Sequence, residues 1–171
     1  MNSALAQYEA KWLNRLNQGA RATFNYGKTA SGAGLHSAVA DAFVTGLGFK
    51  AIGFNWELLD ASAKADEPRS ALGEITRALA SDIGNPSQDW LGGAAASECA
   101  EDFLAAFDRS ALTVVSNRYD GLWNPISGAA VEWGFVCFDD NNEVVEEIVA
   151  FIDGALFHAE SVLVHSFDGV S

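Results

Sequence analysis

Basic residues are scarce in this chain, and none follows Arg118. Ten Lys and Arg face 23 Asp and Glu over 171 residues, which gives a formal net charge of −13. Such a field repels nucleic-acid phosphates and attracts basic surfaces, so we expect no direct contact with nucleic acid and a basic or polar protein partner. Ordinary solubilising charge is the alternative interpretation. The stretch from Tyr119 to Ser171 contains ten acidic residues: Asp120, Glu132, Asp139, Asp140, Glu143, Glu146, Glu147, Asp153, Glu160 and Asp168.

Long apolar runs and cysteine motifs are also lacking. No run of 18 apolar residues occurs, so the sequence predicts no transmembrane helix and no membrane partner. The polar N-terminus runs directly into a helical pattern, and we expect no secretory signal. Cys99 and Cys137 share no spacing motif, which is typical of reduced core residues in a cytoplasmic protein.

The apolar content is sufficient for a folded core. Apolar residues make up 49% of the chain and aromatic residues 11%. A chain of this length is expected to bury about 70% of its unfolded surface as one domain. No repeat or linker divides it, so we predict a single domain over 1–171.

The most regular pattern lies at 131–138. Alternate residues are apolar, which is the period of a strand, and the opposite face also becomes apolar toward the end. A strand covered on both faces normally lies inside a sheet. The four polar residues at 139–142 end it with turn-forming side chains. We therefore predict a central strand here.

The N-terminal half is expected to be helical. Apolar residues recur one turn apart in about five short segments, separated by glycine-rich joints and by a loop at 21–34. The predicted helices begin near Ser3, Ser37, Asn55, Asp66 and Ser97.

After Arg109 the pattern changes to β. Strands are predicted at 112–116 and 161–167, with a loop at 118–128. Residues 143–157 favour a helix, although their Val and Ile content leaves a strand possible. The predicted fold is therefore α+β, a helical N-terminal half packed on a small, mostly antiparallel sheet in the C-terminal half.

One segment has the composition of a phosphate-binding loop. Residues 22–29, which end in Gly27, Lys28 and Thr29, resemble the phosphate loop of P-loop NTPases, with alanine in place of its first glycine. The strand ending at Asp139 resembles the segment that carries the magnesium-side aspartate of that family. The resemblance implies that Lys28 binds phosphate oxygens and Thr29 binds magnesium. A small nucleotide-binding enzyme is our alternative functional hypothesis.

Histidines offer a second possible chemistry. His36, His158 and His165 are the only three. The latter two have nearby Asp residues, so an acid–base or metal site is conceivable. Solvated or backbone-bonded histidines are the simpler interpretation, and we predict no catalytic residue, no metal ligand and no cofactor.

Aromatic residues gather in and beside the predicted loop at 118–128, together with Asn117, which directly precedes it. Tyr119 and Trp123 accompany Arg118 and Asn124 there, with Trp133 close in sequence. Tyrosine and tryptophan supply large contact areas at low entropic cost, so an exposed loop of this composition is typical of a binding surface. The alternative is that Trp123 folds back against the sheet.

Two short stretches resemble segments of mobile-element proteins. Residues 36–55 are similar to a short helical segment found in plasmid and phage proteins. The run at 119–123 resembles part of a plasmid antirestriction family. Neither similarity extends along the chain, so no function is transferred from it.

We therefore predict a non-enzymatic interaction or inhibitory accessory module of mobile-element type. Its partner is expected to be another protein or a second copy in a homodimer. Binding is predicted through an exposed acidic C-terminal face and the aromatic loop at 119–124, and the predicted binding residues are Tyr119, Trp123, Asn124, Glu132, Asp139 and Asp140.

Overall fold

The chain was analysed as a computed structural model that describes residues 3–18, 21–28, 35–82, 85–127, 132–139 and 148–155. Over these ranges it forms four α-helices, one five-stranded antiparallel sheet and two short hairpins. The α+β class is confirmed, with four α-helices in these ranges in place of about five. None of the described helices is both long and apolar enough to cross a membrane.

The sheet has the order β1-β9-β8-β5-β2, and every neighbouring pair is antiparallel. The predicted central strand is confirmed, because β8 is the third of the five. The sheet is not confined to the C-terminal half as predicted, since both edge strands, β1 and β2, come from the first 60 residues. The strand bounds are β1 Arg21–Lys28, β2 Glu57–Leu59, β5 Leu112–Ser116, β8 Glu132–Asp139 and β9 Ile148–Ala155.

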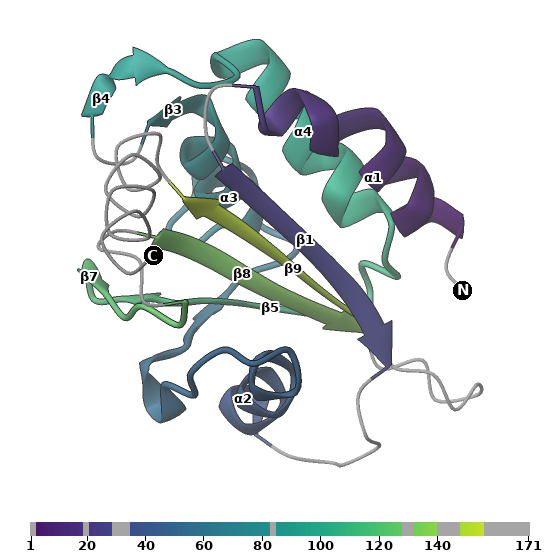
Figure 1. The fold of residues 1–171 in the computed structure, drawn as a ribbon, viewed down its shortest axis with the longest axis vertical. Coiled ribbons are helices and arrows are strands. Elements are labelled where there is room, and N and C mark those ends of the chain that lie inside the picture. The colour runs from purple at the N-terminus through teal and green to yellow at the C-terminus, as the bar shows by residue number, and fades with distance from the viewer. Residues whose placement is uncertain are drawn as a thin grey trace, which may run out of the picture.

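Helices pack on both faces of this sheet. The four are α1 Ser3–Leu16, α2 His36–Gly46, α3 Ala71–Ala80 and α4 Gly93–Ala105. Residues of α1, α3 and α4 share one apolar core with one face of the sheet, and α2 packs on the other. Figure 1 shows α1 and α4 side by side on one side of the sheet and α2 away from them.

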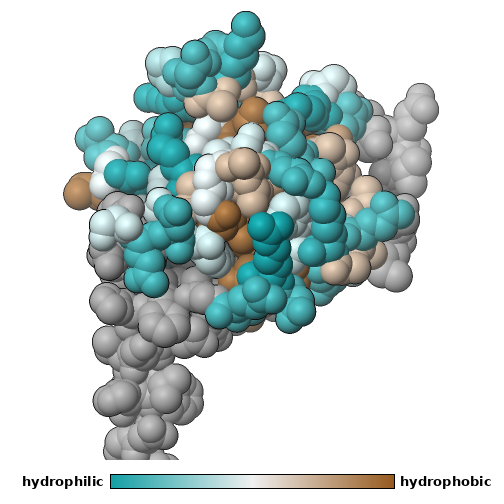
Figure 2. Space-filling model, turned by 90° about the horizontal axis from the view of Figure 1, so that it is seen from above, coloured by the Kyte–Doolittle hydropathy of each residue, from teal (hydrophilic) through white to brown (hydrophobic). Residues whose placement is uncertain are grey.

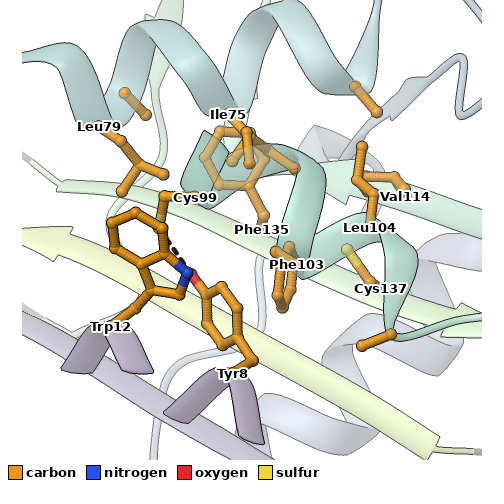
Figure 3. Packing of buried hydrophobic residues seen from close by; sticks show 14 of the residues in the cluster. Tyr8, Trp12, Ile75, Leu79, Cys99, Phe103, Leu104, Val114, Phe135 and Cys137 are labelled. Carbon is orange, nitrogen blue, oxygen red and sulfur yellow. Dashed lines mark hydrogen bonds between the residues drawn. The ribbon is translucent and has the colours of Figure 1, made fainter. Parts of the chain in front are cut away.

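The larger core follows from two periodicities. On α1, Leu5, Tyr8, Trp12 and Leu16 recur every three or four residues and are all buried. On β8, alternate side chains from Trp133 to Cys137 point into the same core. Figure 3 shows α1 residues meeting α4 residues over the sheet, and the Tyr8 hydroxyl lies 3.2 Å from Cys99 Sγ.

The smaller core explains why β8 is apolar on both faces. Val136 points away from the larger core and packs with Val115 of β5. Ala40, Phe43 and Val44 of α2 cover them. The two layers bury every residue of β8 except Phe138, which is half-buried, in line with its apolar composition.

Strand β1 corrects the predicted loop at 21–34. Its residues pair with β9 from Arg21 to Lys28, so the backbone bonds of this segment lie in the sheet. Ala22 and Phe24 are buried, and Tyr26 packs against the same core. This period-2 signal is present in the sequence, but three nearby glycines suggested a loop.

The predicted third helix, from Asn55 to about Lys64, is also wrong. A single 3-10 turn, η1 (Gly53–Asn55), leads directly into β2. The Asp41 carboxylate accepts hydrogen bonds from the backbone N–H of Ile52 and Gly53 and from Trp56 Nε1, all at 2.8 to 2.9 Å. These hydrogen bonds from a distant residue fix the turn, and the local hydrophobic periodicity does not indicate them.

Two helices start at other residues than predicted. Helix α3 begins at Ala71, because Ser70 Oγ accepts the Gly73 N–H at 3.0 Å. A start near Asp66 is unfavourable, because Arg69 has a positive φ of 56°. Helix α4 begins at Gly93, four residues before the predicted cap.

Strand β9 resolves the alternative left open for 143–157. Residues 148–155 form a strand between β1 and β8, so the favoured helix prediction is wrong there. Their β-branched side chains suit a strand with neighbours on both sides. Residues 143–147 and the predicted strand at 161–167 lie outside the described residues.

Candidate functional site

The predicted aromatic loop contains a tight β-hairpin. Strands β6 (Arg118–Tyr119) and β7 (Leu122–Trp123) pair through a two-residue turn. Asp120 and Gly121 have φ values of 50° and 76°, the positive angles of a type I′ turn. An Asp-Gly pair favours this turn, and its twist matches that of paired strands. The hairpin lies at one end of the sheet (Figure 1).

Asn117 anchors the base of the hairpin to β8. It is completely buried, and its Oδ1 accepts the Gly134 N–H at 2.9 Å. Its Nδ2 donates to the carbonyl oxygens of Asn124 and Glu132 at 3.3 and 3.4 Å. The Asn124 N–H donates to the Asn117 carbonyl at 3.0 Å, which closes the hairpin. One amide side chain therefore joins the hairpin to the central strand.

Glu132 holds the segment that follows the hairpin. Its carboxylate accepts hydrogen bonds from the backbone N–H of Ile126 and Ser127 and from the Ser127 hydroxyl. The side chain is completely buried. Glu132 was predicted as part of an exposed acidic surface; its burial instead gives it an internal role, which positions the loop.

Trp123, Trp133 and Arg118 form a cation–π cluster. The two indole rings meet edge to face, with centroids 5.3 Å apart. The Arg118 guanidinium carbon lies 4.7 Å from the Trp123 centroid and 5.0 Å from that of Trp133. Trp133 Nε1 donates to Ser116 Oγ at 3.1 Å, which fixes that ring. Trp123 is half-buried against the larger core, in agreement with the alternative prediction that it folds back against the sheet.

The other face of the hairpin is exposed and apolar. Tyr119 and Leu122 are paired across the hairpin, so their side chains share a face opposite Arg118 and Trp123. Leu122 is 70% exposed and Tyr119 49%. A rigid hairpin that presents two large apolar side chains to solvent is unusual unless something binds them.

Phe54 is a further exposed apolar side chain near this end of the sheet. It is 80% exposed on η1, directly before β2. Because Glu57 pairs with Ser116, residues before β2 and residues after β5 lie at the same end of the sheet. The Lys50 N–H also donates to the Ile126 carbonyl at 2.8 Å, which ties the two loops together. We call Phe54, Tyr119 and Leu122 the hairpin-end surface.

The remaining predicted binding residues lie elsewhere. Asp139 is buried, and its carboxylate accepts the Asp108 N–H at 2.9 Å beyond α4. Asn124 is half-buried and donates to the Leu122 carbonyl. Asp140 lies outside the described residues. Of the ten acidic residues after Arg118, Asp120 is the one whose exposed side chain the structure describes, at the hairpin tip.

The candidate nucleotide residues lie on or beyond β1. The phosphate loop needs a curled backbone whose N–H groups point at phosphate, whereas Gly27 and Lys28 are extended and paired with β9. Lys28 pairs with Ile148 and Phe138 with Val149, so Lys28 and Asp139 lie toward the same end, two strands apart. Thr29 lies outside the described residues.

Histidine and cysteine form no site within the described part of the chain. His36 is the first residue of α2, whereas His158 and His165 lie outside it. No group of three or more metal-binding side chains occurs in the described ranges. Both cysteines are buried and unpaired in disulfides, and burial raises the pKa of the Cys99 thiol to about 12.

A cavity of about 240 Å³ lies between α1 and α4. Its polar groups already bind one another: Lys11 Nζ lies 2.8 Å from Glu98 and 2.7 Å from Asp102, and Trp12 Nε1 donates to Asp102 at 2.8 Å. From above, the described surface is mostly hydrophilic, with apolar groups in small patches (Figure 2). The hairpin-end surface is therefore the better candidate.

Sequence reasoning found the aromatic residues of this site but missed two of its determinants. Asn117 was expected in a binding loop, yet it is an internal anchor, and only the three-dimensional register shows that. Phe54 directly precedes the helix predicted from Asn55 and is not among the predicted binding residues. Comparisons with protein-family models, with curated proteins and with solved structures found no match to this chain.

Proposed function

We propose that this chain is a non-enzymatic protein-interaction module, of accessory or inhibitory type, that binds another protein through its hairpin-end surface. One observation supports this most strongly. Tyr119 and Leu122 are exposed on a hairpin that Asn117 and the cation–π cluster hold rigid. A surface that is already ordered loses little entropy on binding, so more of the contact energy appears as affinity.

The charge of the chain favours a basic partner over a second copy. At −13 per chain, two copies repel each other at long range, whereas a basic protein is attracted and its association accelerated. Neither Glu132 nor Asp139 adds an exposed carboxylate to the contact. The acidic residues therefore act through the summed field, and the apolar side chains supply the direct contact.

Two substitutions that add the same charge test this proposal. Leu122→Asp places a carboxylate on the hairpin-end surface, and Gln88→Asp places one at an exposed position of β4 (Asn85–Asp89). Each full-length variant and the wild type are immobilised, incubated with lysate of the cells that produce the chain, and washed at low and high salt. Captured proteins are quantified by mass spectrometry.

The expected result is a basic protein that wild type and Gln88→Asp retain equally and that Leu122→Asp retains at least about tenfold less. Burying a leucine contributes about 1.5–3 kcal/mol, and tenfold corresponds to about 1.4 kcal/mol. Capture should also weaken at high salt. The proposal fails if no protein distinguishes the two variants. If light scattering shows that wild type and Gln88→Asp are dimers and Leu122→Asp is not, the partner is a second copy of the chain and not a basic protein.

A further inference from the structure

Arg118 lacks an ion pair within the part of this acidic chain that the structure describes. Among the described residues its guanidinium forms no ion pair, and its Nε is buried without a hydrogen-bond acceptor. Asp120 is two residues away and exposed, yet it does not pair with it. Four other cations, Lys11, Arg69, Arg77 and Arg109, have a described carboxylate within 4.0 Å, whereas Arg15, Lys50 and Lys64 lack one as Arg118 does. Arg118 differs from these three in its buried Nε.

The cluster also sets how Arg118 can bind a ligand. Because the two indole rings stand at 76° to each other, the Arg118 guanidinium can lie flat on only one of them, and its N–H donors lie around its edge. The two rings at 4.7 and 5.0 Å and the Arg118 N–H bond to Ser116 Oγ at 3.2 Å restrict the side chain and the start of the hairpin. A planar fork of donors held this way matches the two oxygens of a carboxylate.

We propose that Arg118 is a carboxylate-binding residue, and that it takes an aspartate or glutamate side chain of the protein partner. This inference rests on the proposed function, since the ligand belongs to the partner that covers the hairpin-end surface and that must also reach Arg118 on the opposite face of the hairpin. A phosphate ligand is disfavoured by the −13 charge of the chain, which repels a dianion more strongly than a monoanion. The negative long-range field of the chain then favours a basic partner. Arg118 fixes how that partner is positioned, because this one contact joins a cation of the chain to an acidic side chain of the partner.

A partner-independent titration tests the binding chemistry. The Nε–Hε signals of Arg118 and Arg15 are followed by nuclear magnetic resonance during addition of acetate, inorganic phosphate or chloride. Arg15 is the matched control, because its guanidinium lies 5.4 Å from one indole ring, that of Trp12, on an exposed helix face. Acetate should shift the Arg118 signal with a midpoint at least about tenfold lower than at Arg15, which corresponds to about 1.4 kcal/mol.

Two outcomes of the titration overturn the proposal. Equal responses of Arg118 and Arg15 to acetate would show that the cluster creates no anion site. A lower midpoint for phosphate than for acetate would assign the site to another ligand class.

The captured partner supplies the second test. Arg118→Lys retains the charge but loses the planar fork, so it should reduce capture of the protein that depends on Leu122 at least about tenfold. Its urea midpoint, compared with wild type, reports whether the fold persists. If Arg118→Lys captures that protein as well as wild type does, the carboxylate site is wrong and the proposed function stands. If no protein is captured, the proposed function fails and the acetate titration decides the anion site alone.

Discussion

The replacement Asn117→Ala tests whether one buried amide keeps the hairpin rigid. The alanine leaves the Gly134 N–H without the acceptor it has at 2.9 Å. It also removes the two donors that reach Asn124 O and Glu132 O at 3.3 and 3.4 Å. No water can easily replace these bonds, because Asn117 is completely buried.

The size of the effect follows from these contacts. A buried donor left unpaired costs about 1–3 kcal/mol, and each long bond to a carbonyl about 0.5 kcal/mol. Asn117→Ala should therefore lower the free energy of unfolding by roughly 2–4 kcal/mol. The matched control is Asn124→Ala, whose side chain is half-buried and donates only at 3.3 Å to two carbonyls. Its cost should stay below about 1 kcal/mol.

Urea unfolding followed by tryptophan fluorescence measures both values, and hydrogen exchange locates the change. In Asn117→Ala the Asn124 amide, which closes the hairpin, should exchange faster by more than the loss of global stability explains. In Asn124→Ala the same amide should remain protected. Equal free energies for the two variants, within about 0.5 kcal/mol, would refute the role assigned to Asn117.

Two further replacements test the packing of the helices. In Gly73→Ala the new Cβ would clash with the Ala65 carbonyl oxygen, so the free energy of unfolding should fall by about 1–3 kcal/mol in urea titrations; an unchanged midpoint would contradict this contact. Asp102→Ala removes the acceptor of the buried Trp12 N–H and should cost about 1–3 kcal/mol at pH 7. Hydrogen bonds from Lys11 and then Trp12 lower the pKa of Asp102, so its stabilisation is full above the unfolded pKa and is lost as pH falls through the folded one. Thermal melts should therefore converge for wild type and Asp102→Ala only in acid, and a constant difference down to pH 2 would be inconsistent with this.

The sequence predicts the strands whose own pattern is decisive. Residues 131–138 are apolar on both faces, and β8 lies at the centre of the sheet. The β-branched run at 112–116 is β5, with the predicted bounds. The buried stripe of α1 likewise follows its period. In these segments local propensity and tertiary environment agree.

The errors occur where a distant contact overrides local pattern. Asp41 fixes the turn at η1 from another helix, so the apparent helix after Asn55 never forms. Pairing with β9 makes a strand of 21–28 despite its glycine-rich surroundings, and pairing on both sides makes a strand of 148–155. Each of these depends on long-range register, which a single sequence does not encode in its local periodicity.

The candidate site was predictable in composition but not in geometry. The Asp-Gly pair between Tyr119 and Leu122 signals a hairpin, and the aromatic content signals a contact surface. Burial separates the roles: Glu132 lies inside, whereas Leu122 is 70% exposed. A charged or an apolar side chain can therefore stabilise the fold at one position and be exposed for binding at another.

Footprinting with hydroxyl radicals tests the central claim most directly. The protein captured by the wild-type chain is added to it, and side-chain oxidation is compared with and without that protein. The hairpin-end surface predicts protection of Phe54, Tyr119 and Leu122, with Leu35, which is exposed at the start of α2, left unchanged as the internal control. If these three residues are oxidised as strongly with the captured protein as in the free chain, the account is contradicted.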